Sequence, residues 1–271
     1  MSATPETARK KWQGRSHALD LEGIDFAAFR SRPLEPETLR ALRYMHDVEH
    51  HTVCYLRDLL VTRLHRDPAM TTFLTIWVYE EHWHGEAIGE VLQLHDEPGN
   101  EARISVVRQR LGLHDRLRPL LSQLSTAVLP TMSALHLAWG AVNEWSTQAG
   151  YARLSQLADH PVLSELLCRI MRQEGRHIDF YQREASLRLE ESPLARRLTR
   201  SALAHLWAPV GSGVMPKSEV AFLAGYLFCG VDGEKAAARI DRQIDRLPGL
   251  DGMHLVSRAA ERLGPRAQLA S

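Results

Sequence analysis

One pattern of glutamate and histidine occurs twice along the chain, each time as a lone glutamate followed by a Glu-x-x-His motif. Its members are Glu49, Glu81 and His84 in the first half, and Glu144, Glu174 and His177 in the second. The lone glutamate precedes the motif by 32 residues (81 − 49) in the first half and by 30 (174 − 144) in the second. Residues three apart share one face of a helix, so each half predicts a helical hairpin that presents two carboxylates and one imidazole.

Each of these six residues interrupts an apolar stripe with helical spacing, at a place where leucine would be typical. The stripes are Leu42, Met45, Glu49, Val53, Leu56 and Leu60; Phe73, Trp77, Glu81, His84, Ile88 and Leu92; Leu137, Ala141, Glu144, Gln148 and Tyr151; and Leu163, Leu167, Ile170, Glu174, His177 and Tyr181. None of the stripes contains Lys or Arg. Buried ionised carboxylates are costly without a cation, and two divalent metals would balance four glutamates beside two neutral histidines. The pattern therefore predicts a two-metal site.

Taken singly, these residues also have an ordinary interpretation. A lone histidine on an apolar face is more often a core residue, and a lone glutamate usually reaches solvent. The six together, at matching intervals, favour the metal site. The histidines nearby are expected at the surface or around the ligands, and they are His46, His50, His51, His82 and His95.

Length and composition favour one large domain. With 271 residues and 44% hydrophobic content the chain can bury a full core. Its 33 basic and 33 acidic residues give no basic excess, so we expect no nucleic-acid partner. The three cysteines are widely spaced and predict reduced thiols. The longest apolar run, residues 221–231, is too short to span a bilayer, and no signal peptide is evident, so a cytoplasmic protein is expected.

Helical periodicity without sustained strand alternation predicts an all-α fold. Four long helices are expected at 36 to about 66, 68 to about 96, about 130 to 158 and 161 to about 191, and shorter ones near 194–207, 217–229 and 233–246. Asp67-Pro68 is typical of a cap followed by the first helical residue. We expect an N-terminal arm (1–33), a bundle (34–192) and a C-terminal extension (193–271) packed on the same domain.

Residues 101–129 are expected to form a long connector that crosses the bundle. Its arginines could meet an anionic partner, although a solvated face is favoured, and they are Arg103, Arg108, Arg110, Arg116 and Arg118.

Three runs resemble a known family, the soluble acyl-carrier-protein desaturases, which belong to the ferritin-like di-iron proteins. The runs are Glu80-Glu81-His82-Trp83-His84-Gly85-Glu86, Glu144-Trp145-Ser146-Thr147 and Glu174-Gly175-Arg176-His177, and a later stretch contains Gly233, Lys235 and Ala236. The resemblance covers about residues 36–250. It implies a ferritin-like four-helix bundle with a long crossover between helices two and three and additional C-terminal helices. Gln173 departs from the family, which usually has an acidic residue there.

The same resemblance implies that the six glutamates and histidines are ligands of two iron ions per chain, with a mixed manganese–iron pair also possible. Thr147, one turn beyond Glu144, would manage protons, although an ordinary helix-face hydroxyl that bonds its own backbone is the alternative. A homodimer and acyl carrier protein as a partner are also implied. The sequence has no pair of Cys-x-x-Cys motifs, so electrons would come from an external donor such as a ferredoxin.

Three functions follow as hypotheses. The leading one is an O₂-dependent oxidoreductase that abstracts hydrogen from a carrier-bound acyl chain, with Trp77, Trp139 and Tyr151 along a substrate tunnel or simply filling the core. The second is an oxygenase for a free small molecule, such as an amine, with His46 or His136 as a seventh ligand. The third is a non-catalytic metal-storage bundle, which the extra C-terminal helices disfavour.

Overall fold

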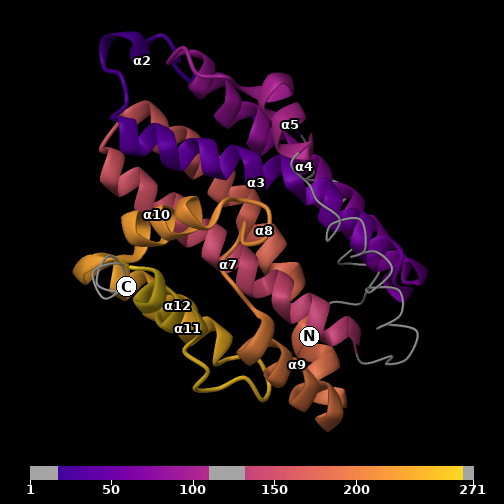
Figure 1. Ribbon diagram of the computed structural model, residues 1–271. Coiled ribbons are helices and arrows are strands. Elements are labelled where there is room, and N and C mark those ends of the chain that lie inside the picture. Colours follow the sequence, from indigo (N-terminus) through magenta and orange to yellow (C-terminus); the bar gives the residue numbers. More distant parts are fainter. Residues whose placement is uncertain (1–17, 110–131, 265–271) are drawn as a thin grey trace. The chain divides into compact units, whose positions relative to one another are not determined.

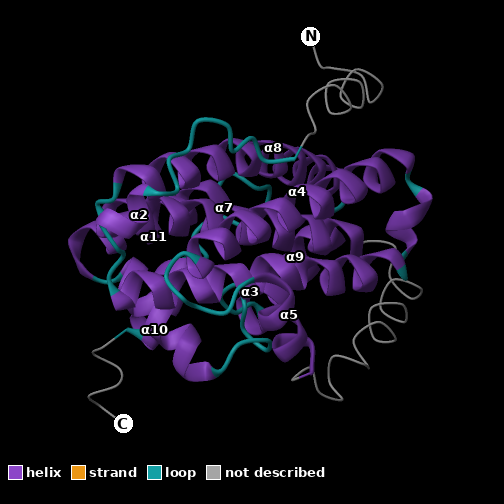
Figure 2. Cartoon of the chain, turned by 90° about the horizontal axis from the view of Figure 1, so that it is seen from above, coloured by secondary structure: helices purple, strands orange, loops and turns teal. Residues whose placement is uncertain are grey.

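The computed structural model describes residues 18–109 and 132–264, and every regular element within these ranges is a helix (Figure 2). The all-α prediction is therefore confirmed for this part of the chain. The elements labelled in Figure 1 and their neighbours are α2 (Ala28–Ser31), α3 (Pro36–Leu60), the 3₁₀ helix η1 (Arg63–Arg66), α4 (Pro68–Gln93), α5 (Asn100–Gln109), α7 (Met132–Ala158), α8 (Pro161–Glu191), α9 (Pro193–Leu206), α10 (Lys217–Phe228), α11 (Gly230–Ile244) and α12 (Leu255–Leu263).

The chain divides into two compact units. The first contains Met1–Pro33 and Met45–Pro130, and the second contains Leu34–Tyr44 and Thr131–Ser271. Helix α3 contributes its residues up to Tyr44 to the second unit and the rest to the first. Most of the connector expected at 101–129 lies outside the described residues, and α5 accounts for its beginning.

Proline and a capping side chain set the start of the long helices. Asp67 accepts hydrogen bonds from the N–H groups of Ala69 and Met70, at 2.9 and 3.3 Å, and Pro68 is the first residue of α4. A proline is tolerated there because the first N–H groups of a helix lack intrahelical acceptors. Ser192 caps α9 in the same way, ahead of Pro193. The Asp67 cap and the start of α4 at Pro68 were predicted from the sequence and are confirmed. Ser192-Pro193 was expected only as the end of the preceding helix, and its role as a cap of α9 was not predicted.

The first unit is built around α4. The predicted stripe on α4 is confirmed, since Phe73, Trp77, Ile88 and Leu92 are all buried. At Gly89 a Cβ would overlap the side chain of Asn100, so the missing side chain lets the start of α5 approach α4. In the arm that precedes α3, Phe29 is buried and lies edge-on to His95, with ring centroids 5.5 Å apart.

Helix α3 differs from expectation toward its end. It stops at Leu60 rather than near residue 66, because Thr62 caps η1 by accepting from the Leu64 N–H. The predicted apolar stripe on α3 is wrong at two positions, because Val53 and Leu60 are 43% and 41% exposed instead of buried. The buried positions here are Asp58 and Leu59, so the covered face has rotated away from the stripe.

In the second unit α7 and α8 pack side by side along their lengths (Figure 1). The predicted α8 stripe is confirmed, with Leu163, Leu167, Ile170 and Tyr181 buried. The two helices lie close together at Gly140 of α7, where an added Cβ would overlap the Tyr181 ring. Helices α9, α10 and α11 also contact α7.

The C-terminal helices α9, α10 and α11 match the three expected, whereas α12 was not anticipated. A buried aspartate explains why α12 forms. The Asp241 carboxylate accepts hydrogen bonds from the N–H groups of Val256 and Ser257, at 2.9 and 3.1 Å, at the start of α12. A carboxylate at a helix N-terminus satisfies N–H groups that have no partner within the helix.

The first turns of α3 are joined to α10 within the second unit. Arg40 donates two hydrogen bonds to Glu219, at 2.7 and 2.9 Å, and its guanidinium lies 4.0 Å from the centre of the Phe222 ring. The Tyr44 hydroxyl donates to the Val210 carbonyl at 2.6 Å. Burial and the charge of Glu219 raise the pKa of Tyr44, so this hydroxyl remains a donor.

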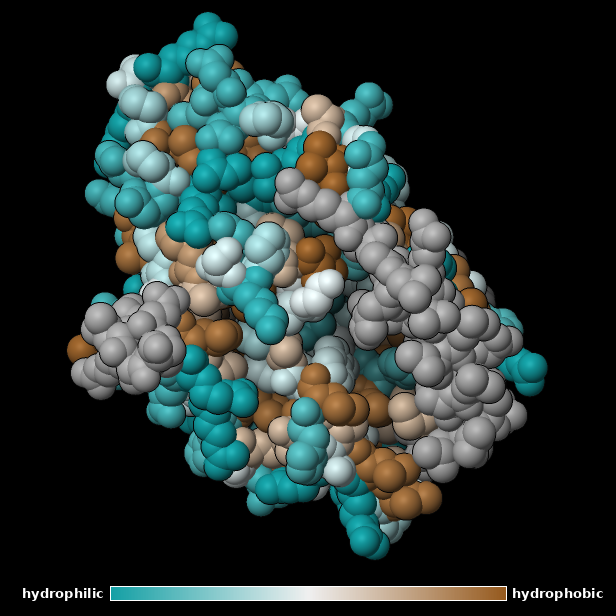
Figure 3. Space-filling view, in the orientation of Figure 1, coloured by the Kyte–Doolittle hydropathy of each residue, from teal (hydrophilic) through white to brown (hydrophobic). Residues whose placement is uncertain are grey.

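Hydrophilic and hydrophobic residues are interspersed on the face drawn in Figure 3. Among the helices of residues 18–109 and 132–264, none is both long and apolar enough to cross a membrane.

The contact between Gly140 and Tyr181 gives a test of the α7–α8 packing. Because the buried tyrosine ring is rigid, Gly140→Ala should destabilise the protein by about 2 kcal/mol, as overpacking of a core usually does. The matched control is Gly175→Ala on α8, where the nearest atom to an added Cβ is Gln148 Nε2 at 3.8 Å. Alanine there should be neutral or stabilise slightly through helix propensity. Urea unfolding of both variants measures the difference, and equal stabilities would contradict the packing.

Candidate metal centres

The first unit contains a buried cluster formed by Glu49 of α3 and Glu81 and His84 of α4. The His84 Nδ1 atom lies 3.9 Å from Glu49 Oε2 and 3.7 Å from Glu81 Oε2. One ligand atom from each of the three residues lies within 4.8 Å of the others. Their exposed fractions are 2%, 3% and 0%. Glu81 and His84 meet because they are three residues apart on one helix face.

The second unit repeats this arrangement with Glu144 of α7 and Glu174 and His177 of α8. The His177 Nδ1 atom lies 3.8 Å from Glu144 Oε2 and 3.2 Å from Glu174 Oε2. Their ligand atoms also lie within 4.8 Å of one another, and all three side chains are buried. The six residues predicted from the sequence thus form one cluster of three within each unit.

The composition of both clusters suits a divalent metal. Two ionised carboxylates and a neutral imidazole carry a charge of −2, which one divalent ion balances. Glutamate oxygens and histidine nitrogens together accept iron, manganese or zinc. Burial favours such an ion, because an uncompensated carboxylate in the interior is destabilising by several kcal/mol. The donor set therefore fits a bound metal in each unit.

The residue before each Glu-x-x-His motif is also buried. Glu80 is 0% exposed and Gln173 is 2% exposed. Glu80 is a carboxylate whose burial the sequence reasoning did not single out, although the doubled glutamate before His84 was the available signal. The matching place in the second unit holds the amide of Gln173 instead of a carboxyl group.

His46 is held by hydrogen bonds at both ring nitrogens. Its Nδ1 lies 3.2 Å from Asp47 Oδ1, and its Nε2 accepts the N–H of Asn100 at 3.1 Å. Arg103 donates to both oxygens of Asp47, at 2.5 and 2.6 Å. His46 is therefore unsuited to be the seventh metal ligand. Arg103 is part of an internal ion pair rather than a docking surface for an anionic partner, while Arg110, Arg116 and Arg118 lie outside the described residues.

His136, the other candidate for a seventh ligand, belongs to none of the groups that could hold a metal among the described residues. It is half-buried on α7, and its Nε2 makes no hydrogen bond to the described part of the chain. Burial lowers its pKa to about 4, so the ring is neutral at neutral pH.

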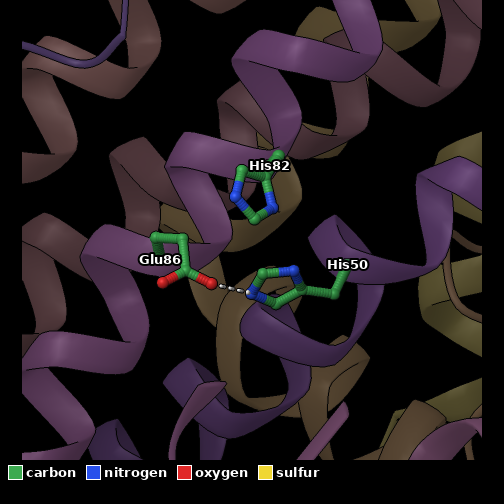
Figure 4. Close-up of side chains that lie close together, drawn as sticks. All are labelled: His50, His82 and Glu86. Atoms are coloured by element: carbon green, nitrogen blue, oxygen red, sulfur yellow. Dashed lines mark ion pairs between the residues drawn. The ribbon is translucent and has the colours of Figure 1, made fainter. Parts of the chain in front are cut away.

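A third group of potential ligands lies in the first unit, formed by His50 of α3 and by His82 and Glu86 of α4 (Figure 4). His82 is exposed, but His50 is 93% buried (7% exposed) rather than at the surface. The pKa of His50 is lowered to about 3, chiefly by burial and further by His46, His82 and Arg108. Sequence reasoning did not identify this group.

The candidate substrate residues lie in different surroundings. In the first unit Trp77 is buried and lies edge-on to Tyr55, with ring centroids 6.0 Å apart. In the second unit Tyr151 is 0% exposed and Trp139 is half-buried, both on α7. Thr147 is half-buried one turn beyond Glu144.

No protein-family model matches the chain, and neither the curated proteins nor the solved structures give a match. The likeness to the desaturases therefore rests on the sequence runs given above.

The lowered pKa of His136 predicts a pH dependence of stability. Between the unfolded value of about 6.5 and the folded value of about 4, the unfolded chain binds a proton that the folded chain does not. As the pH is lowered through this window, the free energy of unfolding should therefore decrease, by about 2 kcal/mol from pH 7.5 to pH 4.5. His136→Leu should lack this contribution. Urea unfolding of both proteins at the two pH values measures it, and an identical loss in the variant would contradict the neutral histidine.

Proposed function

We propose that the protein is an iron-dependent oxidoreductase and that the two clusters supply the ligands of one two-iron centre. The observation that carries this proposal is the repetition of one buried donor set, two glutamates and a histidine, in each unit. A single such cluster would fit an isolated metal ion. Two matched clusters at matching sequence intervals favour a pair of ions that act together.

Iron bound by these residues would supply the activation of O₂ and the abstraction of hydrogen from an organic substrate. The chain supplies the ligands and their placement. Glu81 and His84 are fixed by one helix and Glu174 and His177 by another, so each pair is oriented by backbone geometry. Burial of both clusters excludes bulk water from the ligands. Thr147, one turn from Glu144, is proposed to hold or transfer a proton.

The resemblance to desaturases suggests a carrier-bound acyl chain as the substrate, with an external electron donor such as a ferredoxin, acyl carrier protein as a partner and a homodimeric assembly. Trp77, Trp139 and Tyr151 are the proposed substrate-binding residues. These are large aromatic side chains of the kind that line apolar channels. The amine-oxygenase alternative is less favoured, because neither candidate for its seventh ligand suits that role. Both ring nitrogens of His46 are engaged, and His136 belongs to none of the ligand groups among the described residues.

Substitution of the ligands tests the proposal. Glu81→Gln keeps the size of the side chain but removes a charged ligand, and His177→Ala removes an imidazole. Each should lower the iron content below that of the wild type, which we expect to bind two ions per chain, and should reduce O₂ consumption by the ferrous protein about 100-fold or more. Iron analysis and an oxygen electrode measure the two quantities.

The control is Glu90→Gln, an exposed residue of α4 outside both clusters, which should behave as the wild type. Circular dichroism would verify that each variant is folded. Full iron content and activity in either ligand variant would refute the assignment. Iron binding without O₂ consumption in the wild type would instead indicate storage.

A further inference from the structure

The group formed by His50, His82 and Glu86 is separate from the clusters assigned above. Their ligand atoms lie within 4.8 Å of one another, and the closest recorded pair is His50 Nε2 and Glu86 Oε1 at 3.6 Å (Figure 4). His82 and Glu86 are four residues apart on α4, so they project from the same face of the helix. The third residue is on α3, so the group bridges two helices of the first unit.

His50 is held in place by its surroundings. A Cβ at Gly85 would lie 2.6 Å from His50 Nε2, so the histidine ring occupies the space that a side chain of α4 would otherwise fill. On its other sides the ring lies edge-on to His46 and His82, with centroids 4.5 and 5.6 Å away. A glycine in the middle of a helix is less favourable than alanine, and here it creates the space for this ring.

The buried ring nitrogen faces the other two side chains. His50 is 7% exposed, and its Nε2 atom makes no hydrogen bond to any described residue. A buried polar atom without a hydrogen bond is unfavourable. In Figure 4 this atom points toward the Glu86 carboxylate, and the His82 ring lies on the same side. A metal ion between the three side chains would give it a ligand bond.

We propose that His50, His82 and Glu86 form an additional binding site for a zinc-like divalent transition metal. Two imidazoles and one carboxylate are a donor set that zinc accepts, whereas magnesium and calcium prefer oxygen ligands throughout. Three protein ligands leave a fourth tetrahedral position for water. His82 is exposed and Glu86 is half-buried, so this position faces solvent.

The site is independent of the Glu49, Glu81 and His84 cluster. Consecutive residues of a helix point about 100° apart, so His50 points away from Glu49 and His82 points away from Glu81. No residue belongs to both groups. The proposal therefore does not rest on the oxidoreductase function, and each can fail without the other.

Zinc binding tests the site directly. Metal-depleted protein would be titrated with zinc chloride in competition with a chromophoric chelator. The wild type should bind one zinc ion more per chain than His82→Ala. Glu86→Gln should lower the affinity for that ion at least tenfold. Both substituted residues are at least partly exposed, so the variants should remain folded. Glu90→Gln on the same helix is the matched control and should bind as the wild type.

The same variants separate this site from the proposed iron centre. His82→Ala should retain iron binding and O₂ consumption, whereas Glu81→Gln should retain the zinc ion held by His50. If His82→Ala and Glu86→Gln bind as many zinc ions as the wild type, with the same affinity, the site is refuted. Anomalous diffraction from crystals soaked in zinc chloride gives a second test. A peak within bonding distance of His50 Nε2 is expected, and its absence there would also overturn the proposal.

Discussion

Burial of ionisable side chains inside helical packing is the constraint on which the rest of this structure depends. In each unit two glutamates and a histidine occupy positions where an apolar side chain would be more stable by itself. Such a group is tolerated when a cation balances the carboxylates, and one divalent ion per cluster gives a net charge of zero. The leucines, isoleucines and aromatic residues that flank the clusters on α4 and α8 supply the apolar contacts that hold the ligands in place.

The residue that precedes the Glu-x-x-His motif differs between the two units. A buried glutamate precedes Glu81, whereas a buried glutamine precedes Glu174. The two Glu-x-x-His motifs therefore follow different buried polar groups, a carboxyl group in the first unit and an amide in the second. Around α3 the chain of hydrogen bonds from Arg103 through Asp47 and His46 to Asn100 fixes the start of α5 against α3. The polar groups of this network hold α5 in place, close to the first cluster.

Features that depend on one helix were predictable from the sequence. The meeting of Glu49 with Glu81 and His84 of the next helix was also expected, from the repeated spacing, whereas other contacts between helices were not. The stripes on α4 and α8 and the Asp67 cap follow from spacing along a single segment, and they are confirmed. Two features depend on contacts between residues 30 or more apart, namely the ion pair of Arg103 and the group around His50. The exposure of Val53 depends on how far a neighbouring helix extends. Gly85 was visible as part of a motif, but its effect on the His50 ring required the crossing of α3 and α4. Helix α12 was missed because Asp241, which supports its first turn, lies 15 residues away.

X-ray absorption spectroscopy of the iron-loaded protein tests most directly whether the two clusters act as one centre. If they do, the iron scattering should contain a second iron at roughly 3.5–4 Å, the separation typical of two-metal sites, beside oxygen and nitrogen neighbours. Iron that shows only oxygen and nitrogen neighbours, with no second metal at that distance in protein loaded with two ions, would contradict the account.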